Sequence, residues 1–266
     1  MNSAIEEIQF LANSANRVRV LEALTDGTTT RRELEDETGV PRSTVARALD
    51  EAESRGWVDS EGSRYWITPA GAARVDAFRR YVETTEGMHH LGEALGWLPD
   101  PVRELDYRSF RDATVTTPTQ GNPTAPFDRA MELIREADEY RGLTQNSLPE
   151  YMDVVRDRVE REQMAFEAVL QRDFVAVLRD EPDRAATWRT VADRTWLYDG
   201  TVPLNMHVVD ERVLIWLCDE NHTGEEALVR GLLESGRPSV VSWAESLYEQ
   251  YHSEAEPMDV EVLAPT

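Results

Sequence analysis

The sequence predicts an α/β (α+β) protein in which an N-terminal winged helix-turn-helix, a connecting helix and a C-terminal domain with a mixed β-sheet flanked by helices follow one another. Two short helical patterns meet at Gly39 and are followed by a two-stranded pattern that turns at residues 61–63. Beyond a Thr- and Pro-rich stretch at residues 114–126, helical and strand-like segments alternate, as they do in sheets covered by helices. The length of 266 residues suffices for one or two domains.

The charge balance is unusual. There are 51 acidic residues against 28 basic ones, and because lysine is absent every basic residue is an arginine. A net charge of −23 would ordinarily repel a polyanion such as DNA. We interpret the composition as adaptation to a salt-rich cytoplasm, in which molar salt shortens the Debye length to about 3 Å. An ordinary acidic protein is the alternative interpretation.

Several classes of protein are excluded. Without lysine there is no P-loop, no Schiff-base lysine and no His-Lys-Asp phospholipase motif. No apolar run approaches the ~20 residues that cross a bilayer, and residues 1–7 carry no secretory signal. Cys218 is the single cysteine, which favours a reducing cytoplasm. We therefore predict a cytoplasmic protein that does not act at a membrane and is not an enzyme.

A metal site is conceivable only near the single cysteine. The residues that could tempt such an assignment are Cys218, Asp219, Glu220 and His222. Four residues this close in sequence do not wrap one ion easily, and no CxxC pair exists. We predict no metal and no cofactor.

The winged helix-turn-helix domain is predicted at residues 1–70. Apolar residues recur at helical spacing over residues 3–12 and 14–25, which predicts two helices or one bent helix. Thr30 followed by Glu33 has the spacing of a capping box and begins the next helix. A second helix is predicted over residues 41–55, with an inward apolar stripe.

One residue departs from the usual helix-turn-helix pattern. Gly39 supplies the left-handed turn between the two helices. The position four residues earlier is usually small because the helices cross there, yet it is Glu35. Two readings stay open: the crossing is looser, or Glu35 swings outward.

The outward end of the second helix and its surroundings carry the predicted DNA contacts. They are arginines and hydroxyl side chains, namely Arg31, Arg32, Arg42, Ser43, Thr44, Arg47 and Arg64. We expect Ser43, Thr44 and Arg47 to reach base edges, and Arg42 with the helix N-terminus to take a phosphate. Arg64 lies near the tip of a predicted hairpin and should meet a flanking backbone or the minor groove. The first two arginines begin the preceding helix and could reach phosphates.

The rest of the chain is divided as follows. Residues 71–100 form a connecting or dimerisation helix (helical pattern over 70–97), residues 101–256 an α/β effector or dimerisation domain, and residues 257–266 a tail. Helices in the C-terminal domain are predicted at about 127–140, 148–162, 171–180, 184–193, 223–235 and 239–252. Strands are predicted at about 112–116, 164–170, 195–199, 203–209 and 212–218.

Two parts of the sequence resemble known families. Residues 14–71 resemble archaeal winged helix-turn-helix regulators of the ArsR, MarR and TrmB kind, on the motifs GVPRSTVAR at 39–47 and WITPAG at 66–71. Residues from about 110 to 255 resemble the effector domain of haloarchaeal regulators and of a methanogenesis regulator. The matching segments are PFDRAMELI at 126–134, YRGL at 140–143, PLNMHVVDERVL at 203–214 and WAESLYEQY at 243–251.

The resemblance implies a transcriptional regulator that binds double-stranded DNA as a homodimer. We expect a sequence-specific regulator of a salt-adapted archaeon, with helix 41–55 in the major groove of a pseudo-palindromic operator whose half-sites lie about one helical turn apart. The C-terminal domain would pair two protomers and could sense an unidentified small-molecule effector. A sheet edge with aromatic residues and arginines is where such a pocket is expected.

Two other hypotheses remain open. In one, the C-terminal domain binds a metabolite or catalyses a reaction, and the winged helix is an accessory used for protein contacts. Its arginines would then be paired to acids such as Glu51 and Glu53. In the other, the chain is an interaction scaffold that does not bind DNA. Binding to DNA that depends on Arg42 and Arg47 would separate the regulator from both.

Overall fold

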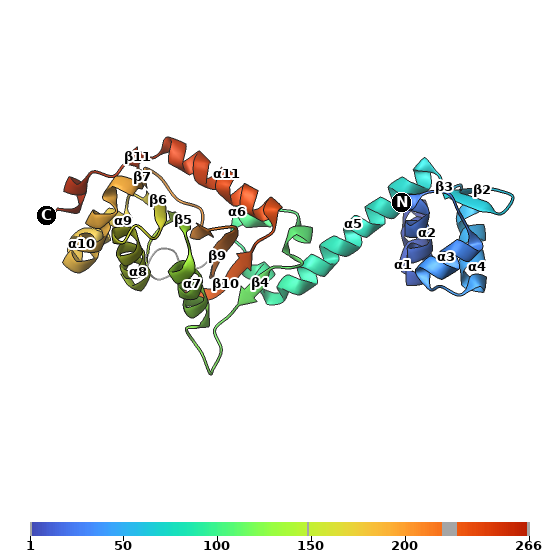
Figure 1. Ribbon diagram of the computed structural model, residues 1–266, viewed down its shortest axis with the longest axis horizontal. Coiled ribbons are helices and arrows are strands. Elements are labelled where there is room, and N and C mark those ends of the chain that lie inside the picture. The colour runs from blue at the N-terminus through green and yellow to red at the C-terminus, as the bar shows by residue number, and fades with distance from the viewer. Residues whose placement is uncertain (1, 148, 220–227, 265–266) are drawn as a thin grey trace. The chain divides into compact units, whose positions relative to one another are not determined.

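The computed structural model describes residues 2–147, 149–219 and 228–264. The chain divides into two compact units, Met1–Thr85 and Glu86–Thr266 (Figure 1). Each unit has its own hydrophobic core. No helix within the described ranges is both long and apolar enough to cross a membrane.

The first unit is a winged helix-turn-helix. Its elements in order are α1 (Asn2–Ala12), α2 (Ala15–Ala23), η1 (Leu24–Asp26), β1 (Thr29–Thr30), α3 (Arg31–Thr38), α4 (Arg42–Glu53), β2 (Val58–Glu61) and β3 (Arg64–Ile67). The three strands pair antiparallel in the order β1-β3-β2. β1 is a short strand that the sequence pattern does not reveal, because two threonines give no periodicity.

Local sequence signals explain where these helices begin and end. The capping box at α3 is confirmed: the Glu33 backbone N–H donates to Thr30 Oγ1 at 3.3 Å, and the Thr30 backbone N–H donates to Glu33 Oε2 at 2.8 Å. Gly39 has φ +65°, the left-handed conformation that glycine adopts without strain. The chain can therefore turn sharply from α3 into α4.

α5 (Pro69–Leu91) follows the hairpin, and Thr68 Oγ1 accepts the backbone N–H of Gly71 at 3.1 Å. A Cβ on Gly71 would lie 2.2 Å from the Trp57 carbonyl oxygen, so only glycine fits there. The helix predicted to extend to residue 97 ends at Leu91. Gly92 has φ +53°, and the chain continues as the 3₁₀ helix η2 (Gly92–Trp97).

The second unit is built on an eight-stranded mixed sheet. Its strands are β4 (Thr114–Thr116), β5 (Glu139–Thr144), β6 (Ala165–Gln171), β7 (Thr195–Tyr198), β8 (Met206–Val209), β9 (Arg212–Cys218), β10 (Val229–Ser235) and β11 (Glu256–Pro257). The order across the sheet is β11-β7-β6-β5-β8-β9-β10-β4. β5, β6 and β7 are parallel, and the other pairs are antiparallel.

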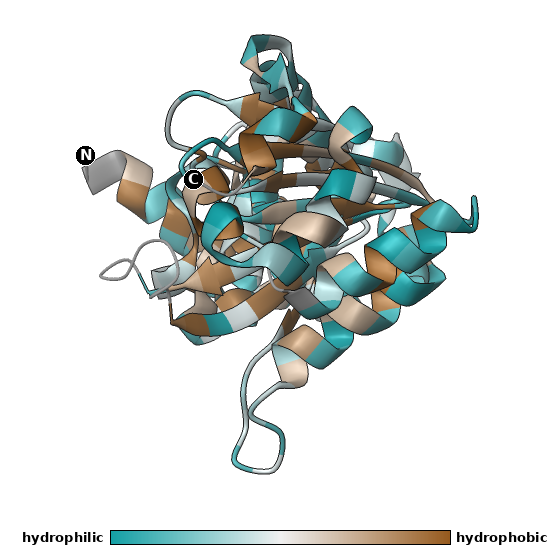
Figure 2. Cartoon of the chain, turned by 90° about the vertical axis from the view of Figure 1, so that its left-hand side faces the viewer, coloured by the Kyte–Doolittle hydropathy of each residue, from teal (hydrophilic) through white to brown (hydrophobic). Residues whose placement is uncertain are grey.

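Helices cover both faces of this sheet (Figure 1). One face packs against α7 (Ala125–Glu136), α8 (Pro149–Glu160), α9 (Phe174–Asp180), α10 (Pro182–Thr190), η4 (Ala192–Arg194) and η6 (Val260–Leu263). The other packs against η2, α6 (Asp100–Arg103), η3 (Tyr107–Phe110) and α11 (Pro238–Glu254). Figure 2 shows the helices alternating between hydrophobic and hydrophilic residues, as expected for elements with one buried face.

Two sequence predictions in this unit are wrong. The segment predicted as a helix at 223–235 contains strand β10 over Val229–Ser235, and its earlier part lies outside the described residues. β10 lies between β9 and β4, and its last five residues are buried. The buried run GLLES has no apolar spacing typical of a helix. Its strand conformation depends on pairing with the neighbouring strands β9 and β4. β5, which pairs with β6 and β8, is missing from the predicted strands because it is short and contains Arg141 and Gly142.

An ion cluster around the buried carboxylate of Glu234 joins three elements of the second unit. Glu234 on β10 accepts hydrogen bonds from Arg129 on α7 at 2.9 and 3.0 Å, and from Arg212 on β9 at 2.6 Å. Although burial alone would raise the pKa of Glu234, the two guanidinium groups lower it below its usual value. This cluster ties α7 to strands β9 and β10 of the sheet.

Candidate nucleic-acid interface

One side of α4 is packed against the hydrophobic core of the first unit. Leu34 on α3, and Val45 and Leu49 on α4, are fully buried in the core of the first unit. Val40, just after the turn, is buried with them. The direction of α4 is therefore fixed by packing along one side, and its other side is open.

The open side of α4 carries most of the predicted contact residues. Arg42, Ser43 and Arg47 are exposed, whereas Thr44 is half-buried. At 100° per residue, Ser43 and Arg47 lie near the centre of the outward face and Thr44 lies at its edge, beside the apolar stripe. Ser43 and Arg47 are thus better placed for base contacts than Thr44.

The five arginines predicted to contact DNA fall into two groups. Arg42, Arg47 and Arg64 have no acidic partner within 4.0 Å among the described residues. Arg31 donates to Asp50 at 2.8 Å and lies 5.1 Å from the centre of the Tyr65 ring. Arg32 lies 3.9 Å from Asp36 as an exposed pair. Cations of the first group are free to meet phosphates or bases.

Asp50 and Glu51 on α4 are both neutralised by arginines from other helices. Arg31 on α3 pairs with Asp50, and Arg17 on α2 pairs with Glu51 at 2.6 Å. The guanidinium of Arg17 also lies 3.9 Å from the centre of the Phe10 ring. If the domain served only protein contacts, its arginines were expected to pair with acids of this kind. Such pairs do occur, but they are formed by Arg31 and Arg17 and not by the arginines of α4. Sequence reasoning missed Arg17, because nothing in the pattern places α2 beside α4.

The wing is the β2–β3 hairpin, which turns at Gly62 with φ +63°. Arg64 is exposed at the start of β3 and pairs in register with Thr30, so it lies beside the start of α3. The Glu33 carboxylate accepts hydrogen bonds from the Thr30 backbone N–H and from the Thr29 hydroxyl. These bonds lower the pKa of Glu33, and the charge of Arg64 adds a smaller effect.

Glu35 is half-buried, and its side chain bridges the turn between α3 and α4. Its carboxylate Oε1 accepts the backbone N–H of Arg42 at 3.2 Å. The N-cap residue of α4 is Pro41, which offers no side-chain cap. The first amide of α4, expected to be available to a DNA phosphate, is therefore already hydrogen-bonded within the protein.

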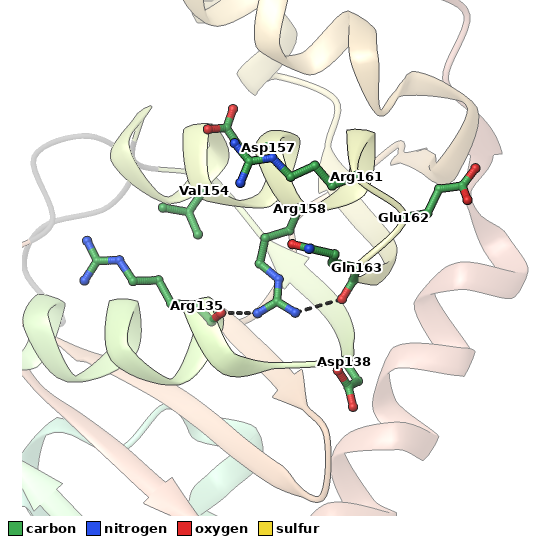
Figure 3. A pocket seen from close by; sticks show the side chains of 8 residues that line it. All are labelled: Arg135, Asp138, Val154, Asp157, Arg158, Arg161, Glu162 and Gln163. Atoms are coloured by element: carbon green, nitrogen blue, oxygen red, sulfur yellow. Dashed lines mark hydrogen bonds between the residues drawn. The ribbon is translucent and has the colours of Figure 1, made fainter.

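The second unit contains a hollow of about 710 Å³ with three arginines, Arg135, Arg158 and Arg161 (Figure 3). Arg158 donates hydrogen bonds to the carbonyl oxygens of Arg135 and, at 2.7 Å, Gln163. It thus satisfies carbonyl groups at the ends of α7 and α8. Arg135 points away from Arg158 in Figure 3, so the three guanidinium groups do not converge on one ligand.

Another hollow, of about 410 Å³, lies where the parallel strands β5, β6 and β7 begin. Its lining combines aromatic residues with charged ones: Glu139, Tyr140, Arg141, Ala165, Phe166, Glu167, Asp193, Arg194 and Trp196. An edge of the sheet with aromatic residues and arginines is where the sequence analysis expects an effector pocket.

The four residues considered as a metal site, Cys218, Asp219, Glu220 and His222, lie partly outside the described residues. Among the described residues, no group of three or more side chains that could hold a metal ion occurs.

A polar chain is buried in the core of the second unit. The Trp216 indole N–H donates to His207 Nε2 at 2.9 Å, and His207 Nδ1 lies 2.7 Å from the Tyr140 hydroxyl. Because Nε2 accepts, the single proton of the neutral ring resides on Nδ1. Burial lowers the pKa of His207 to about 4 and raises that of Tyr140 above its usual value.

The fold and the exposed arginines of α4 define the class: a winged helix-turn-helix protein with an appended α/β domain, the architecture of archaeal winged-helix regulators. Two family models specify it further. Residues 5–89 match the HVO_A0261 N-terminal domain, and residues 123–254 match the middle domain of the methanogenesis regulatory protein FilR1. The N-terminal domain of the chain is thus similar to the first family and most of the larger domain to the second, and together the two matches support a transcription regulator.

Solved structures of similar fold include TrmBL2, described as an archaeal chromatin protein. It is 17% identical, with 95% of this chain and 99% of that chain covered and a TM-score of 0.42. NucT from Helicobacter pylori is 10% identical over 55% of this chain and 99% of its own, with a TM-score of 0.42. Nuc from Salmonella typhimurium, a phospholipase D family member, is 10% identical over 55% and 96%, with a TM-score of 0.41. At these values the likenesses carry no argument about function. A search of curated proteins finds no match.

Proposed function

We propose that the protein is a sequence-specific DNA-binding regulator that acts as a homodimer in a salt-adapted cytoplasm. α4 enters the major groove, Ser43 and Arg47 contact base edges, and Arg42 and Arg64 contact the backbone on either side. The observation that carries the proposal is that three of the predicted contact arginines have no acidic partner among the described residues, in an acidic domain where Asp50 and Glu51 of α4 are already paired with arginines.

The paired residues have a different part in this proposal. Arg31 neutralises Asp50, which otherwise would present a negative charge to DNA from the outward face of α4. Arg32 remains a phosphate contact because its pair with Asp36 is long and exposed, and such pairs are weak. Thr44 contributes at the edge of the interface. With few free arginines, counterion release contributes little, and affinity rests mainly on base contacts and shape.

The proposed dimer rests on an apolar surface of the first unit. Ile5 and Ile8 on α1 and Tyr81 and Val82 on α5 are exposed, with 53% of Ile8 and 66% of Tyr81 accessible. Glu7 on α1 pairs with Arg74 on α5 at 2.8 Å, so the two helices meet at this point. A second copy covering this surface would remove large apolar side chains from water.

The second unit is proposed as the effector and additional pairing domain. The aromatic hollow at the start of the parallel strands is the place where we expect a small molecule to bind. The proposal assigns the chain no catalytic step, metal or cofactor. Its operator would be pseudo-palindromic, as the symmetry of a dimer requires.

A mobility shift with the DNA upstream of the protein's own gene tests the proposal. The double substitution Arg42→Ala/Arg47→Ala should weaken specific binding about 100-fold, because each lost charged contact costs ~1–3 kcal/mol. Its thermal unfolding should match that of the wild type, since neither arginine has a partner to lose. Arg19→Ala, at an exposed arginine of α2 that lines a hollow with α3 and α5, is the matched control. Equal binding by wild type and double variant would refute the proposed interface.

A further inference from the structure

The turn between α3 and α4 contains a carboxylate that the proposed function does not use. Glu35 is half-buried, and its Oε1 accepts the backbone N–H of Arg42 at 3.2 Å. Within the described residues no arginine lies within 4.0 Å of this carboxylate. Its charge is balanced only by the amide dipoles at the start of α4.

The position of this carboxylate coincides with the proposed DNA footprint. Arg42 and Ser43, both exposed, form the first turn of α4, which is the end directed at DNA in the proposed complex. A DNA phosphate approaching Arg42 would meet the same amide that Glu35 occupies, and the two anions would compete for this N–H donor and repel each other. The other acids near this face differ, because Asp50 and Glu51 are each paired to an arginine.

We propose that Glu35 is a built-in competitor of the DNA backbone at the start of α4, which lowers the affinity of the winged helix for all DNA. This inference rests on the proposed function and concerns the regulation of the same site. Because Glu35 repels phosphate irrespective of base sequence, it weakens nonspecific binding as much as specific binding. The ratio of operator affinity to bulk-DNA affinity is therefore set by the base contacts, while Glu35 sets the overall strength of binding.

The competing role and a purely structural capping role predict different effects on DNA affinity when the charge of Glu35 is removed. As a cap, Glu35 stabilises α4 by satisfying an amide that Pro41 leaves without a side-chain acceptor. As a competitor, it costs DNA affinity. Removing its charge should therefore tighten DNA binding while leaving the fold equally or slightly less stable, two changes of opposite sign.

The test compares Glu35→Gln with Glu37→Gln in the full chain. Glutamine keeps an oxygen acceptor for the Arg42 N–H, so the variant should fold. Glu37 is exposed on the same helix, lines a hollow formed with α2 and α5, and loses the same charge. Dissociation constants are measured by fluorescence anisotropy on operator and on scrambled DNA, from low to molar KCl, together with thermal unfolding.

We expect Glu35→Gln to bind both DNAs about tenfold more tightly at low salt than wild type. Its plot of log affinity against log salt should steepen by about 0.9, the contribution of one added phosphate contact. Glu37→Gln should change affinity less than twofold. If the two variants behave alike while wild type binds, Glu35 is only a cap and the inference is wrong. If wild type and both variants bind no DNA, the proposed function itself fails.

Discussion

At the scale of single residues, the first unit separates two uses of arginine. Arg17 and Arg31 hold Glu51 and Asp50, and both also lie over aromatic rings, so they belong to the framework of the domain. Arg42 and Arg47 have no such contacts. In a chain with 51 acidic residues, Arg42 and Arg47 stay without an acidic partner among the described residues although Asp50 and Glu51 lie on the same helix. That contrast distinguishes candidate contacts from structural residues more sharply than sequence position does.

A residue-scale prediction concerns His207. The pKa of this buried ring is lowered from 6.5 to about 4, so the unfolded chain takes up a proton at a higher pH than the folded one. The stabilisation is complete above about pH 6.5 and is lost as the pH falls towards 4, by about 3 kcal/mol in total. His207→Gln keeps a donor and an acceptor but does not titrate.

Urea unfolding from pH 7 to pH 4 measures this effect. The variant should lose markedly less stability than wild type over this range, although other groups contribute to both curves. Parallel curves for the two proteins would show that His207 is already charged in the folded state or is not buried.

At the scale of elements, the orientation of α4 depends on the short helix before it. α3 has only eight residues and one fully buried anchor, Leu34, so its ends matter more than its middle. The capping box at Thr30 and the left-handed Gly39 fix those two ends. The positions of the groups on α4 that face DNA follow from these local features.

An element-scale prediction tests the capping box. Thr30→Ala removes the acceptor for the Glu33 backbone N–H and should lower the free energy of unfolding by about 1 kcal/mol. Thr28→Ala, at an exposed threonine before β1, is the control and should change it by less than half as much. Chemical unfolding followed by circular dichroism provides the measurement. Equal effects at both positions would mean that the cap contributes nothing to stability.

How far the sequence predicts each element depends on whether its signal is local. The capping box and turn glycine are local, and both are confirmed. β10 and β5 exist because neighbouring strands pair with them on both sides, and no spacing within either segment conveys that. The same limit applies at the site: exposure of Arg42 and Arg47 follows from helix periodicity, but the pairing of Arg31 with Asp50 required the relative placement of α3 and α4.

At the scale of the whole molecule, the net charge of −23 and the proposed partner oppose each other. The proposal reconciles them through high salt, few free arginines and a dimer that doubles the number of contacts. Two weak half-site contacts joined in one particle give an affinity that neither has alone. The dimer is therefore essential to the proposal.

A whole-molecule prediction tests that dimer. Tyr81→Asp places a charge on the exposed apolar surface of α1 and α5 and should convert the protein to a monomer that binds the operator at least tenfold more weakly. Val260→Asp, at an exposed apolar residue of the second unit, is the control and should leave the mass unchanged. Light scattering after gel filtration measures the mass. A Tyr81→Asp protein with the mass of wild type would show that this surface does not pair protomers.

Localised DNA cleavage from α4 tests the central claim most directly. Cys218 is the only cysteine, so Cys218→Ala with Ser43→Cys leaves one thiol for an iron chelate on the outward face of α4. Bound to the operator, this conjugate should cut in the major groove at two places about one helical turn apart. The same chelate attached through Glu37→Cys should cut weakly and without fixed position. No localised cleavage from position 43, or the same pattern from both positions, would contradict the claim that α4 reads DNA.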